Sequence, residues 1–597
     1  MNDFTRLFDI IYYQKEKYHQ DVAFANKLNG TWQHHNTQEV IDTANKVSLS
    51  LLKLGVKPGD KLALVSNNRP EWNMTDIGML QAGAVNVPVY PTISEHEYKF
   101  IFNDAEIQYA FVSDAKLYAK IASIKTDVPS LKEIFTFDKV DGCKSFSDFL
   151  KLGEGGDLNE VEKIKAAVKP ADMATIIYTS GTTGNPKGVM LSHNNIVSNI
   201  KAVSPILPLN ENQKVLSFLP LCHIFERVVV YVYMMHGVSV YYAESMETIA
   251  DNLKEVKPNF FTTVPRLLEK VFIKLESAGN NLEGWKKGLY ANALEFAKNF
   301  DVSKPMPLVD RLKKAVYDKL IYVKWREALG GNCEGICAGA AALNPVLARV
   351  FTCAGIPIME GYGQTESSPV ISVNPFSLDK ICFGTVGMTI EGVEVKLDHR
   401  DGMAEGEGEI WAKGPNIMMG YYKRPDLTAE TIVDGWLKTG DVGTWVEYKG
   451  NKYLKITDRV KELFKTSGGK YISPQQIENK MKEIPYVEQI MVVGENRNFV
   501  SALIVPNFLN LSEWCLKNGV AAKTPDEMVK NPEVQKLFKT SIDDKNKNFG
   551  QWETIKKFEL MPKEWTIESG ELTPTTKVKR KVVNEKYKDL IEHIYTN

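Results

Sequence analysis

The sequence predicts an α/β protein with a large N-terminal domain of stacked α/β sheets, a small β subdomain and a smaller α+β C-terminal domain. Three observations lead to this prediction. Short apolar runs alternate with amphipathic helical stretches, then short strands with Gly turns follow, and a Lys- and Glu-rich region with new strands comes last. The 597 residues, 44% of them hydrophobic, suffice for several hydrophobic cores.

The strands of the N-terminal domain are predicted from five short apolar runs that are rich in β-branched residues. Because helix-length stretches separate these runs, we expect parallel sheets covered by helices. The runs are KLALVS (61–66), YAFVS (109–113), ATIIY (174–178), KVLSFL (214–219) and NFFTTV (259–264).

A helical insertion is predicted between about residues 282 and 331, where apolar residues recur at helical spacing. Gly330 and Gly331 end the pattern, and a strand, GICAGAA, follows. The two apolar stripes consist of Trp285, Leu289, Phe296 and Phe300, and of Leu308, Leu312, Ala315 and Leu320.

The rest of the chain differs in composition from the N-terminal part and is also predicted to contain strands. From about residue 383, TVGMTIEGVEVKL and GEGEIWAKG are short alternating strands with Gly turns, which predicts the β subdomain. New strands, EQIMVVG and SALIVP, follow in the Lys- and Glu-rich part. We place the domain boundary at Arg459, giving domains 1–459 and 460–597.

Composition narrows the class of protein. A formal net charge of −1 and a pI near 6.8 argue against a nucleic-acid-binding protein. Seven scattered Cys without zinc-ligand spacing suggest reduced thiols and a cytoplasmic protein. The longest apolar tract, VVVYVYMM from residue 228, is far shorter than the roughly 20 residues that span a bilayer. Peripheral contact with the inner membrane face stays open, as does the choice between monomer and homodimer.

One loop, YTSGTTGNPKGV (178–189), has the composition of a phosphate-binding loop. Its backbone N–H groups and hydroxyls can surround phosphate oxygens, and Lys187 supplies positive charge. It is not the P-loop G-x-x-x-x-G-K-[ST], because Pro186 replaces the second Gly and Gly188 replaces the hydroxyl residue. Taken alone, the loop also fits a flexible surface segment.

Six further motifs follow this loop in a fixed order. With it, they resemble the adenylate-forming superfamily of acyl-CoA synthetases, luciferases and peptide-synthetase adenylation domains, over nearly the whole chain. NNRPEWN (67–73), YPT (90–92), HIFER, the helical insertion and TPTTKVKR are similar to the long-chain fatty acyl-CoA synthetase branch. The six motifs are LPLCHIFER (219), GAAAL (339), GYGQTES (361), GWLKTGDVG (435), ITDRVKELFKTSGGKYISP (456) and LTPTTKVKR (572).

The resemblance implies a long-chain fatty acid–CoA ligase that uses ATP, Mg²⁺ and CoA. A fatty acid carboxylate attacks the α-phosphate of ATP to give acyl-AMP and pyrophosphate, and the thiol of CoA then displaces AMP. The C-terminal domain is implied to be mobile between these steps. The chain has no Gly-x-Ser-x-Gly motif, which disfavours a hydrolase.

The resemblance also implies roles for the nucleotide-binding residues. Tyr362 stacks on adenine, Thr365 touches the phosphate, and Glu366 binds Mg²⁺ together with Thr183. Asp441 accepts hydrogen bonds from the ribose hydroxyls, with Arg459 as its partner. Thr179, Ser180, Gly181, Thr182, Thr183, Gly184 and Lys187 surround the triphosphate, and the other nucleotide-binding positions are Gly339, Ala340, Glu360, Gly361, Gly363 and Ile456.

The motifs near the C-terminus imply the catalytic lysine and the CoA side. Lys577 bridges the carboxylate and the α-phosphate, with Lys579 as a competing register because Thr576 stands where much of the superfamily has Gly. Lys461 is the hinge about which the C-terminal domain rotates. Ser467, Gly468 and Gly469 line the pantetheine tunnel.

Two further motifs imply where the fatty acid binds. His223 shapes the substrate channel beside the carboxylate, and residues 228–235 with 339–343 are candidates for the acyl wall. An amino-acid- or aryl-acid-adenylating enzyme is an alternative. For an amino acid, such an enzyme needs a buried carboxylate, and Glu226 is near the right place, although the adjoining Arg227 could neutralise it.

Two further alternatives concern the molecule that accepts the acyl group and whether the protein is catalytic. An acyl carrier protein could replace CoA as the acceptor. The protein could also bind nucleotides without being catalytic. Such a protein would be expected to have lost catalytic residues, whereas this chain retains Lys187, Thr365, Glu366, Asp441, Arg459 and Lys577.

Overall fold

The computed structural model describes residues 4–179, 185–400, 403–460, 462–468, 470–573 and 577–596. Contacts divide the chain into two compact units. The larger unit comprises Met1–Val395, Ala412–Leu437 and Glu447–Tyr453; the smaller unit comprises Lys396–Trp411, Lys438–Val446 and Leu454–Asn597. The units interleave along the sequence between residues 396 and 454, and the domain boundary at Arg459 stays a prediction.

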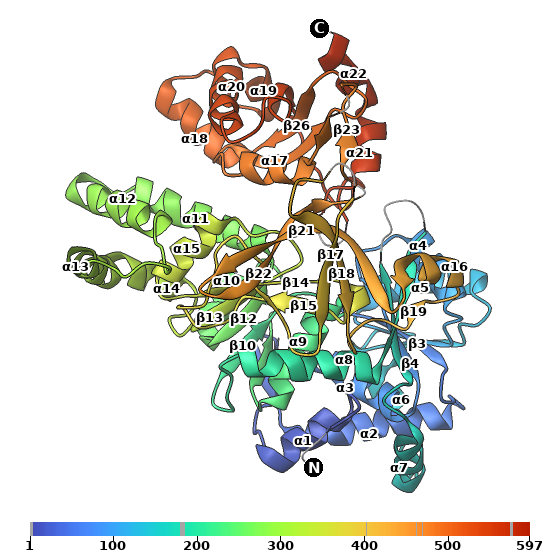
Figure 1. Ribbon diagram of the computed structural model, residues 1–597. Helices are drawn as coiled ribbons and strands as arrows, with labels where there is room; N and C mark the ends of the chain where they lie inside the picture. The colour runs from blue at the N-terminus through green and yellow to red at the C-terminus, as the bar shows by residue number, and fades with distance from the viewer. Residues whose placement is uncertain are drawn as a thin grey trace. The chain divides into compact units, whose positions relative to one another are not determined.

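An eight-stranded sheet forms one half of the larger unit (Figure 1). Strands β3 to β8 pair in parallel, as the alternation of strands and helices predicts, whereas β9 and β19 add an antiparallel edge that it does not predict. In spatial order the strands are β19 (Gly420–Tyr421), β9 (Lys187–Ser192), β8 (Met173–Thr179), β4 (Val85–Pro88), β3 (Lys61–Val65), β5 (Tyr109–Val112), β6 (Glu133–Thr136) and β7 (Lys144–Ser145).

A nine-stranded sheet forms the other half. Its centre is parallel, and antiparallel strands close both edges. In spatial order the strands are β16 (Met388–Thr389), β15 (Val370–Val373), β14 (Ile358–Gly363), β13 (Gly335–Ala338), β12 (Phe260–Thr263), β10 (Lys214–Ser217), β11 (Ser239–Tyr242), β1 (Phe24–Leu28) and β2 (Thr31–His35). All five predicted apolar runs are therefore confirmed as strands of these two sheets.

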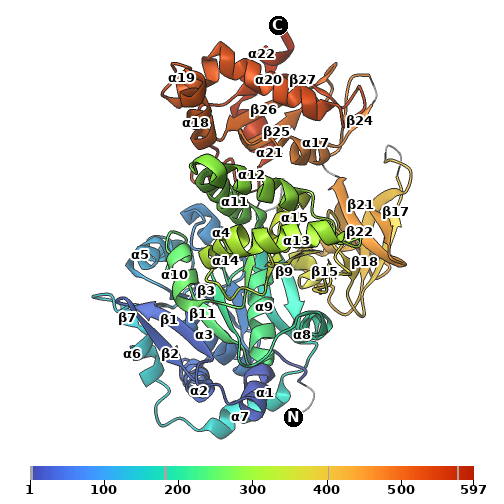
Figure 2. The ribbon, with the colours of Figure 1, turned by 90° about the vertical axis from the view of Figure 1, so that its left-hand side faces the viewer.

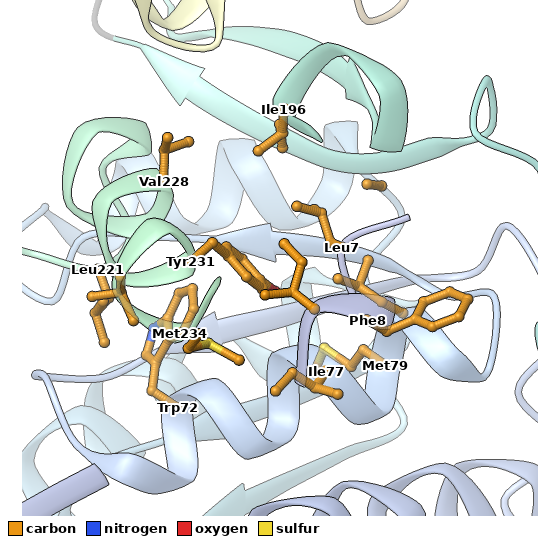
Figure 3. Packing of buried hydrophobic residues seen from close by; sticks show 14 of the residues in the cluster. Leu7, Phe8, Trp72, Ile77, Met79, Ile196, Leu221, Val228, Tyr231 and Met234 are labelled. Atoms are coloured by element: carbon orange, nitrogen blue, oxygen red, sulfur yellow. The ribbon is translucent and has the colours of Figure 1, made fainter. Parts of the chain in front are cut away.

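Helices join the two sheets through a shared hydrophobic core. The largest buried cluster contains side chains from both sheets and from α3 (Pro70–Gln81), α8 (His193–Val203) and α9 (Ile224–Met235). Figure 3 shows Trp72 and Ile77 of α3 with Tyr231 and Met234 of α9 in this cluster. The other helices of the two-sheet region are α1 (Asp9–Lys17), α2 (Thr37–Lys53), α4 (Glu95–Asp104), α5 (Ala115–Ser123), α6 (Phe146–Lys151), α7 (Leu158–Ala167), α10 (Ile249–Val256), α15 (Pro345–Cys353) and α16 (Pro425–Thr431).

A fully buried ion pair crosses this core. Arg227 of α9 donates from Nη2 to Oδ1 of Asp76 at 2.6 Å and from Nε to Oδ2 at 3.1 Å, and neither side chain is exposed. Asn86 and Tyr231 also donate to the Asp76 carboxylate, and Arg227 Nη1 donates to Thr175 of β8. A buried charge is tolerated only with such a complete set of partners, so this network fixes α3 and α9 to the eight-stranded sheet.

The predicted insertion is helical. It forms α12 (Gly284–Lys298), α13 (Leu308–Tyr317), a π-helix (Asp318–Tyr322) and α14 (Val323–Ala328), preceded by α11 (Pro265–Asn280). Tyr290, Tyr322 and Trp325 form its small core. Figure 1 shows α12 and α13 extending away from the sheets of the larger unit, and in Figure 2 the same helices face the viewer. Among the described residues, no helix is both long and apolar enough to cross a membrane.

The predicted β subdomain and the C-terminal strands are also present. A five-stranded sheet contains β17 (Glu394–Asp398), β18 (Glu407–Lys413), β20 (Ile432–Val433), β21 (Trp436–Tyr448) and β22 (Asn451–Arg459). The smaller unit adds the hairpin β23 (Phe464–Lys465) and β24 (Tyr471–Ile472), and the sheet β25 (Val487–Val493), β26 (Val500–Pro506) and β27 (Ile555–Leu560). Its helices are α17 (Pro474–Met481), α18 (Phe508–Asn518), α19 (Pro525–Lys530), α20 (Pro532–Asn546), α21 (Arg580–Lys586) and α22 (Lys588–Thr596).

Candidate functional site

The predicted phosphate-binding loop connects the antiparallel strands β8 and β9. Thr179 and Lys187 are cross-strand partners at the two ends of the loop, and both are half-buried. The hairpin thus fixes the position of the lysine relative to the start of the loop. Ser180, Gly181, Thr182, Thr183 and Gly184 lie outside the described residues.

A two-residue strand, β19, pairs with β9 beside this lysine. Gly420 lies opposite Met190 and Tyr421 lies opposite Val189. The backbone N–H of Tyr422 donates to the Gly188 carbonyl oxygen at 2.7 Å, which extends the pairing by one residue. The pairing brings Tyr421, which sequence reasoning did not single out, to the loop.

Lys187, Tyr421 and Glu366 form a cluster on this edge of the sheet. The Lys187 Nζ lies 5.2 Å from the centre of the Tyr421 ring, within cation–π range. The Tyr421 hydroxyl donates to Glu366 Oε1 at 2.8 Å. Burial raises the pKa of Tyr421, and the Glu366 carboxylate raises it further, so the hydroxyl remains a donor. The structure therefore places a cation near the ring of one tyrosine and a carboxylate at its hydroxyl.

The GYGQTES motif supplies this carboxylate through a strand and a tight turn. β14 continues through Gly363, so Tyr362 lies within the strand, opposite Ser372 of β15. A Cβ at Gly363 would lie 1.7 Å from the Pro369 carbonyl oxygen, so only Gly fits there. Thr365 is buried and begins the 3-10 turn that carries Glu366.

Glu360 connects the same strand to the segment GAAAL. Its Oε1 accepts a hydrogen bond from the backbone N–H of Leu343 at 3.0 Å, and burial raises the pKa of its carboxyl to about 8. Within that segment, Ala340 has a φ of +68°, an unusual conformation for a residue with a side chain. Gly339 lies against Phe225, since a Cβ there would be 3.2 Å from the Phe225 ring. Gly361, one residue after Glu360, lies near the Val373 side chain of β15.

His223 lies at the start of α9. It is the N-cap residue, and its Nδ1 accepts a hydrogen bond from the backbone N–H of Phe225 at 3.2 Å. The preceding loop is held by Asn68, which donates to the Leu219 carbonyl oxygen and accepts from the Leu221 N–H. Asn68 belongs to the NNRPEWN segment, so that segment orients the turn from which His223 projects.

The adjoining residues Glu226 and Arg227 do not pair with each other. Glu226 is buried and accepts hydrogen bonds from Ser217 Oγ at 2.6 Å and from Thr262 Oγ1, both on the nine-stranded sheet. Burial raises the pKa of Glu226 to about 7. Arg227 instead binds Asp76, so the expectation that Arg227 could neutralise Glu226 is wrong. Successive residues of a helix point about 100° apart, and here they face different sheets.

The predicted acyl wall contributes to the core. Residues 228–234 of α9 are all buried, and Figure 3 labels three of them, Val228, Tyr231 and Met234, in the central cluster. The first turn of α9 differs from the rest of the helix, because Phe225 is only half-buried and lies against Gly339. The half-buried apolar surface near His223 is therefore formed by the first turn of α9, where Phe225 lies against Gly339.

In the smaller unit, Asp441 and Arg459 meet as an ion pair. Arg459 Nε donates to Asp441 Oδ1 at 2.8 Å, and Asp441 is buried while Arg459 is half-buried. The backbone N–H of Asp441 donates to Thr439 Oγ1 within strand β21. Ile456 is half-buried on the adjacent strand β22, and Lys461 lies outside the described residues.

Asp458, beside Arg459, is a buried carboxyl that sequence reasoning missed. It accepts hydrogen bonds from the Arg459 N–H and from Ser473 Oγ, and burial raises its pKa to about 7. In the sequence, the position of this acidic residue near the predicted hinge is the signal that could have identified it. The contact with Ser473 ties β22 to the start of α17, which follows the loop that contains Ser467 and Gly468.

That loop connects β23 and β24. Ser467 is exposed, and its Oγ donates to Asn498 Oδ1 at 2.7 Å. Gly468 is exposed as well, and Gly469 lies outside the described residues. In the described part of the loop, Ser467 and Gly468 are therefore exposed to solvent, as is the longer side chain of Lys470.

Lys577 lies in a short hairpin near the C-terminus. Leu572 and Val578 form an antiparallel bridge, and the Lys577 N–H donates to Thr573 Oγ1 at 3.0 Å. Val578 packs against a buried cluster, whereas Lys577 is exposed. The Lys579 N–H donates to the Glu571 carbonyl oxygen, and this residue caps α21. Lys577 therefore pairs with Thr573, whereas Lys579 pairs with Glu571 and lies at the start of α21.

Arg580 anchors this hairpin to the segment after the predicted hinge. It donates to Glu462 Oε2 at 3.0 Å, to Glu478 Oε1, and to the Val492 carbonyl oxygen at 3.1 Å. The charge-assisted contacts connect α21, α17 and residue 462. From the sequence, this arginine has no role of its own beyond its place in the motif LTPTTKVKR.

Comparison with known proteins gives consistent results. The AMP-binding enzyme family matches residues 11–422, and the AMP-binding enzyme C-terminal domain matches residues 462–597. The chain is 33% identical over 579 residues to the long-chain-fatty-acid–CoA ligase FadD15 of Mycobacterium bovis, covering 96% of this chain and 94% of the relative. It is also 33% identical to long-chain-fatty-acid–CoA ligase 1 of Homo sapiens, covering 94% of this chain and 82% of that protein.

Solved structures share the fold at lower identity. The adenylation domain of a carboxylate reductase from Mycobacterium chelonae superposes with a TM-score of 0.76 at 21% identity, covering 99% of this chain and 91% of that one. The anthranilate CoA ligase AuaEII, in complex with anthranoyl-AMP, superposes with a TM-score of 0.73 at 18% identity, covering 98% of both chains. With the family match over most of its length, the chain belongs to the AMP-binding enzyme family and is an adenylate-forming enzyme.

Proposed function

We propose that the protein is a long-chain fatty acid–CoA ligase. It joins a fatty acid to ATP, releasing pyrophosphate and forming acyl-AMP, and then transfers the acyl group to the thiol of CoA. The observation that carries this proposal is the 33% identity to curated long-chain ligases over 96% of the chain. The Lys187–Tyr421–Glu366 cluster supports the first half-reaction.

On the nucleotide side, the residues of the larger unit bind the phosphates. Lys187 offers a cation and the loop between β8 and β9 offers hydroxyls and N–H groups, which stabilise the charge that develops as a carboxylate approaches a triphosphate. Tyr362 is proposed to stack on adenine, and Thr365 to donate to the phosphate.

Glu366 fits a Mg²⁺ site of the kind that uses substrate phosphates. Among the described residues there is no cluster of three or more His, Cys, Asp or Glu that could hold a metal ion. Mg²⁺ commonly binds one or two carboxylates plus phosphate oxygens, so a single oriented carboxylate is a suitable donor. Glu366 is proposed to hold the ion with the hydroxyl of Thr183, and the ion when bound neutralises phosphate charge.

In the smaller unit, two groups of residues are proposed to act in turn. Asp441, held by Arg459, accepts hydrogen bonds from the ribose hydroxyls. Lys577 places its ammonium between the fatty acid carboxylate and the α-phosphate during adenylation. Rotation about Lys461 then exchanges this face for the loop that contains Ser467 and Gly468, which lines the path of the CoA thiol.

The acid is proposed to enter beside the first turn of α9. His223 caps this helix, and Phe225 with Gly339 provides apolar surface next to it. Glu226 is a poor partner for a substrate ammonium group, because its two oxygens already accept hydrogen bonds from Ser217 and Thr262. This contact set favours a fatty acid over an amino acid.

The test is ATP–pyrophosphate exchange with long-chain fatty acids, aryl acids and amino acids, followed by addition of CoA or an acyl carrier protein. We expect exchange with fatty acids and thioester formation with CoA. Exchange with amino acids or aryl acids alone would refute the substrate class. Transfer to the carrier protein but not to CoA would refute the acceptor.

Replacing Tyr421 with Phe tests the cluster itself. The ring below Lys187 is kept, but the hydroxyl that orients Glu366 is lost. A hydrogen bond to a charged group contributes about 1.5–3 kcal/mol, so we expect exchange to slow by roughly 10- to 100-fold with a higher Mg²⁺ requirement. Tyr422→Phe, the neighbouring tyrosine, is the control and should keep the parent rate. Equal rates for both variants would contradict the role of Tyr421.

A further inference from the structure

Helix α13 presents a row of large apolar side chains to solvent. The row, called here the apolar stripe, lies on one face because its members follow helical spacing into the π-helix. These side chains are among the most exposed apolar groups of the larger unit. The stripe consists of Leu308 (73% exposed), Val309 (62%), Leu312 (63%), Val316 (48%) and Leu320 (44%).

The helix is attached to the insertion from its other side. No residue of α13 is buried, and the Tyr317 ring packs edge-on against Phe296 of α12 with ring centres 5.6 Å apart. Ile321 and Tyr322, in the π-helix that follows, are buried. The helix is thus held through its C-terminal end, and the apolar stripe is the face that its neighbours leave uncovered.

Basic side chains flank the apolar stripe. At about 100° per residue, Arg311 and Lys313 lie on opposite edges of it, and both are exposed. Between residues 308 and 324 there are five Lys or Arg and two Asp, in a chain of net charge −1. Asp310 pairs with Lys313 at 3.7 Å and Asp318 pairs with Arg326 at 2.8 Å, so five basic and two acidic residues leave a net excess of three positive charges in the segment. The segment is therefore a local positive surface.

We propose that α13 docks the protein on a lipid bilayer that contains anionic headgroups. Apolar side chains that enter the acyl boundary, with Lys and Arg beside them at the headgroups, are the features of interfacial helices. A second copy of the chain would bring the same basic edges together, which charge repulsion disfavours. The proposal rests on this surface and does not depend on the substrate.

The test is sedimentation of the full chain with vesicles of phosphatidylcholine, with or without phosphatidylglycerol. We expect binding to the anionic vesicles that weakens as salt is raised. Leu312→Glu with Val316→Glu should lower the partition coefficient at least tenfold. Arg311→Glu with Lys313→Glu should lower binding to anionic vesicles and leave the weak binding to phosphatidylcholine nearly unchanged.

The matched control places two carboxylates on an exposed apolar surface elsewhere. Leu509→Glu with Leu516→Glu on α18 changes side chains that are 63% and 83% exposed, and should bind vesicles like the parent. Thermal unfolding of each variant checks that it is folded, and the charge-reversal pair tests the surface should the stripe pair unfold.

Three results would overturn the proposal. The parent chain could remain in the supernatant with anionic vesicles, or the stripe and control variants could bind equally well. The third is a parent dimer in sedimentation velocity that the stripe variant converts to a monomer without any effect on vesicle binding. That outcome would assign the apolar stripe to self-association.

Discussion

Replacing Lys577 with Ala is expected to slow acyl-AMP formation by at least roughly 10²–10³-fold, the effect of losing one charge-stabilising donor. Conversion of supplied acyl-AMP and CoA to the thioester should be retained, because the proposed ammonium acts only while the carboxylate and the α-phosphate are being joined. ATP–pyrophosphate exchange measures the first step, and thioester formation from synthetic acyl-AMP measures the second.

Lys579→Ala is the control for this prediction, since it removes the competing lysine two residues away. Lys577 is exposed and its hairpin is held by backbone contacts and Val578, so the substitution should not unfold the smaller unit. Near-normal exchange in Lys577→Ala together with loss in Lys579→Ala would transfer the role to Lys579. Equal loss of both half-reactions would argue against a role confined to adenylation.

Replacing Asp76 with Ala is expected to destabilise the larger unit by about 3–5 kcal/mol, because the guanidinium of Arg227 would remain buried without its carboxylate. Tyr231 and Asn86 would lose their acceptor as well. Urea unfolding of the full chain, with the transition of the larger unit followed at equilibrium, measures the change in free energy of unfolding.

A double variant, Asp76→Leu with Arg227→Met, separates the unpaired charge from the loss of packing. Removing both partners of a buried ion pair avoids the unpaired charge, so we expect the double variant to recover part of the lost stability. The remainder is the cost of Tyr231 and Asn86, which still lack their acceptor. If Asp76→Ala unfolds at the same urea concentration as the parent, the ion pair does not support the core as described.

Much of the fold follows from local sequence patterns. Runs such as ATIIY are confirmed as strands because buried parallel strands are short, apolar and rich in β-branched residues. The antiparallel strand β19 could not be predicted in this way. It has only two residues, and it exists because Tyr421 meets Val189, far away in the sequence.

The candidate site shows the same division. Motifs locate Lys187 and Glu366, but the tyrosine between them is visible only once β19 is paired. Glu226 and Arg227 adjoin in the sequence, yet α9 directs one to Ser217 and the other to Asp76. Spacing predicts the helix that contains Leu308 and Leu312, but it does not reveal that this face is exposed, because amphipathic spacing is the same for a buried stripe.

The pairing of β19 with β9 also sets the order in which the site can appear during protein synthesis. The ribosome adds about 230 residues between Val189 and Tyr421. At roughly 5–20 residues per second, a nascent chain spends roughly 10–50 s with the β8–β9 hairpin made and its partner strand not yet translated. Throughout that interval the hairpin edge lacks β19, and Glu366, once synthesised, has no tyrosine to orient it. The nascent chain can therefore form the Lys187–Tyr421–Glu366 cluster only late, after most of the larger unit has been translated.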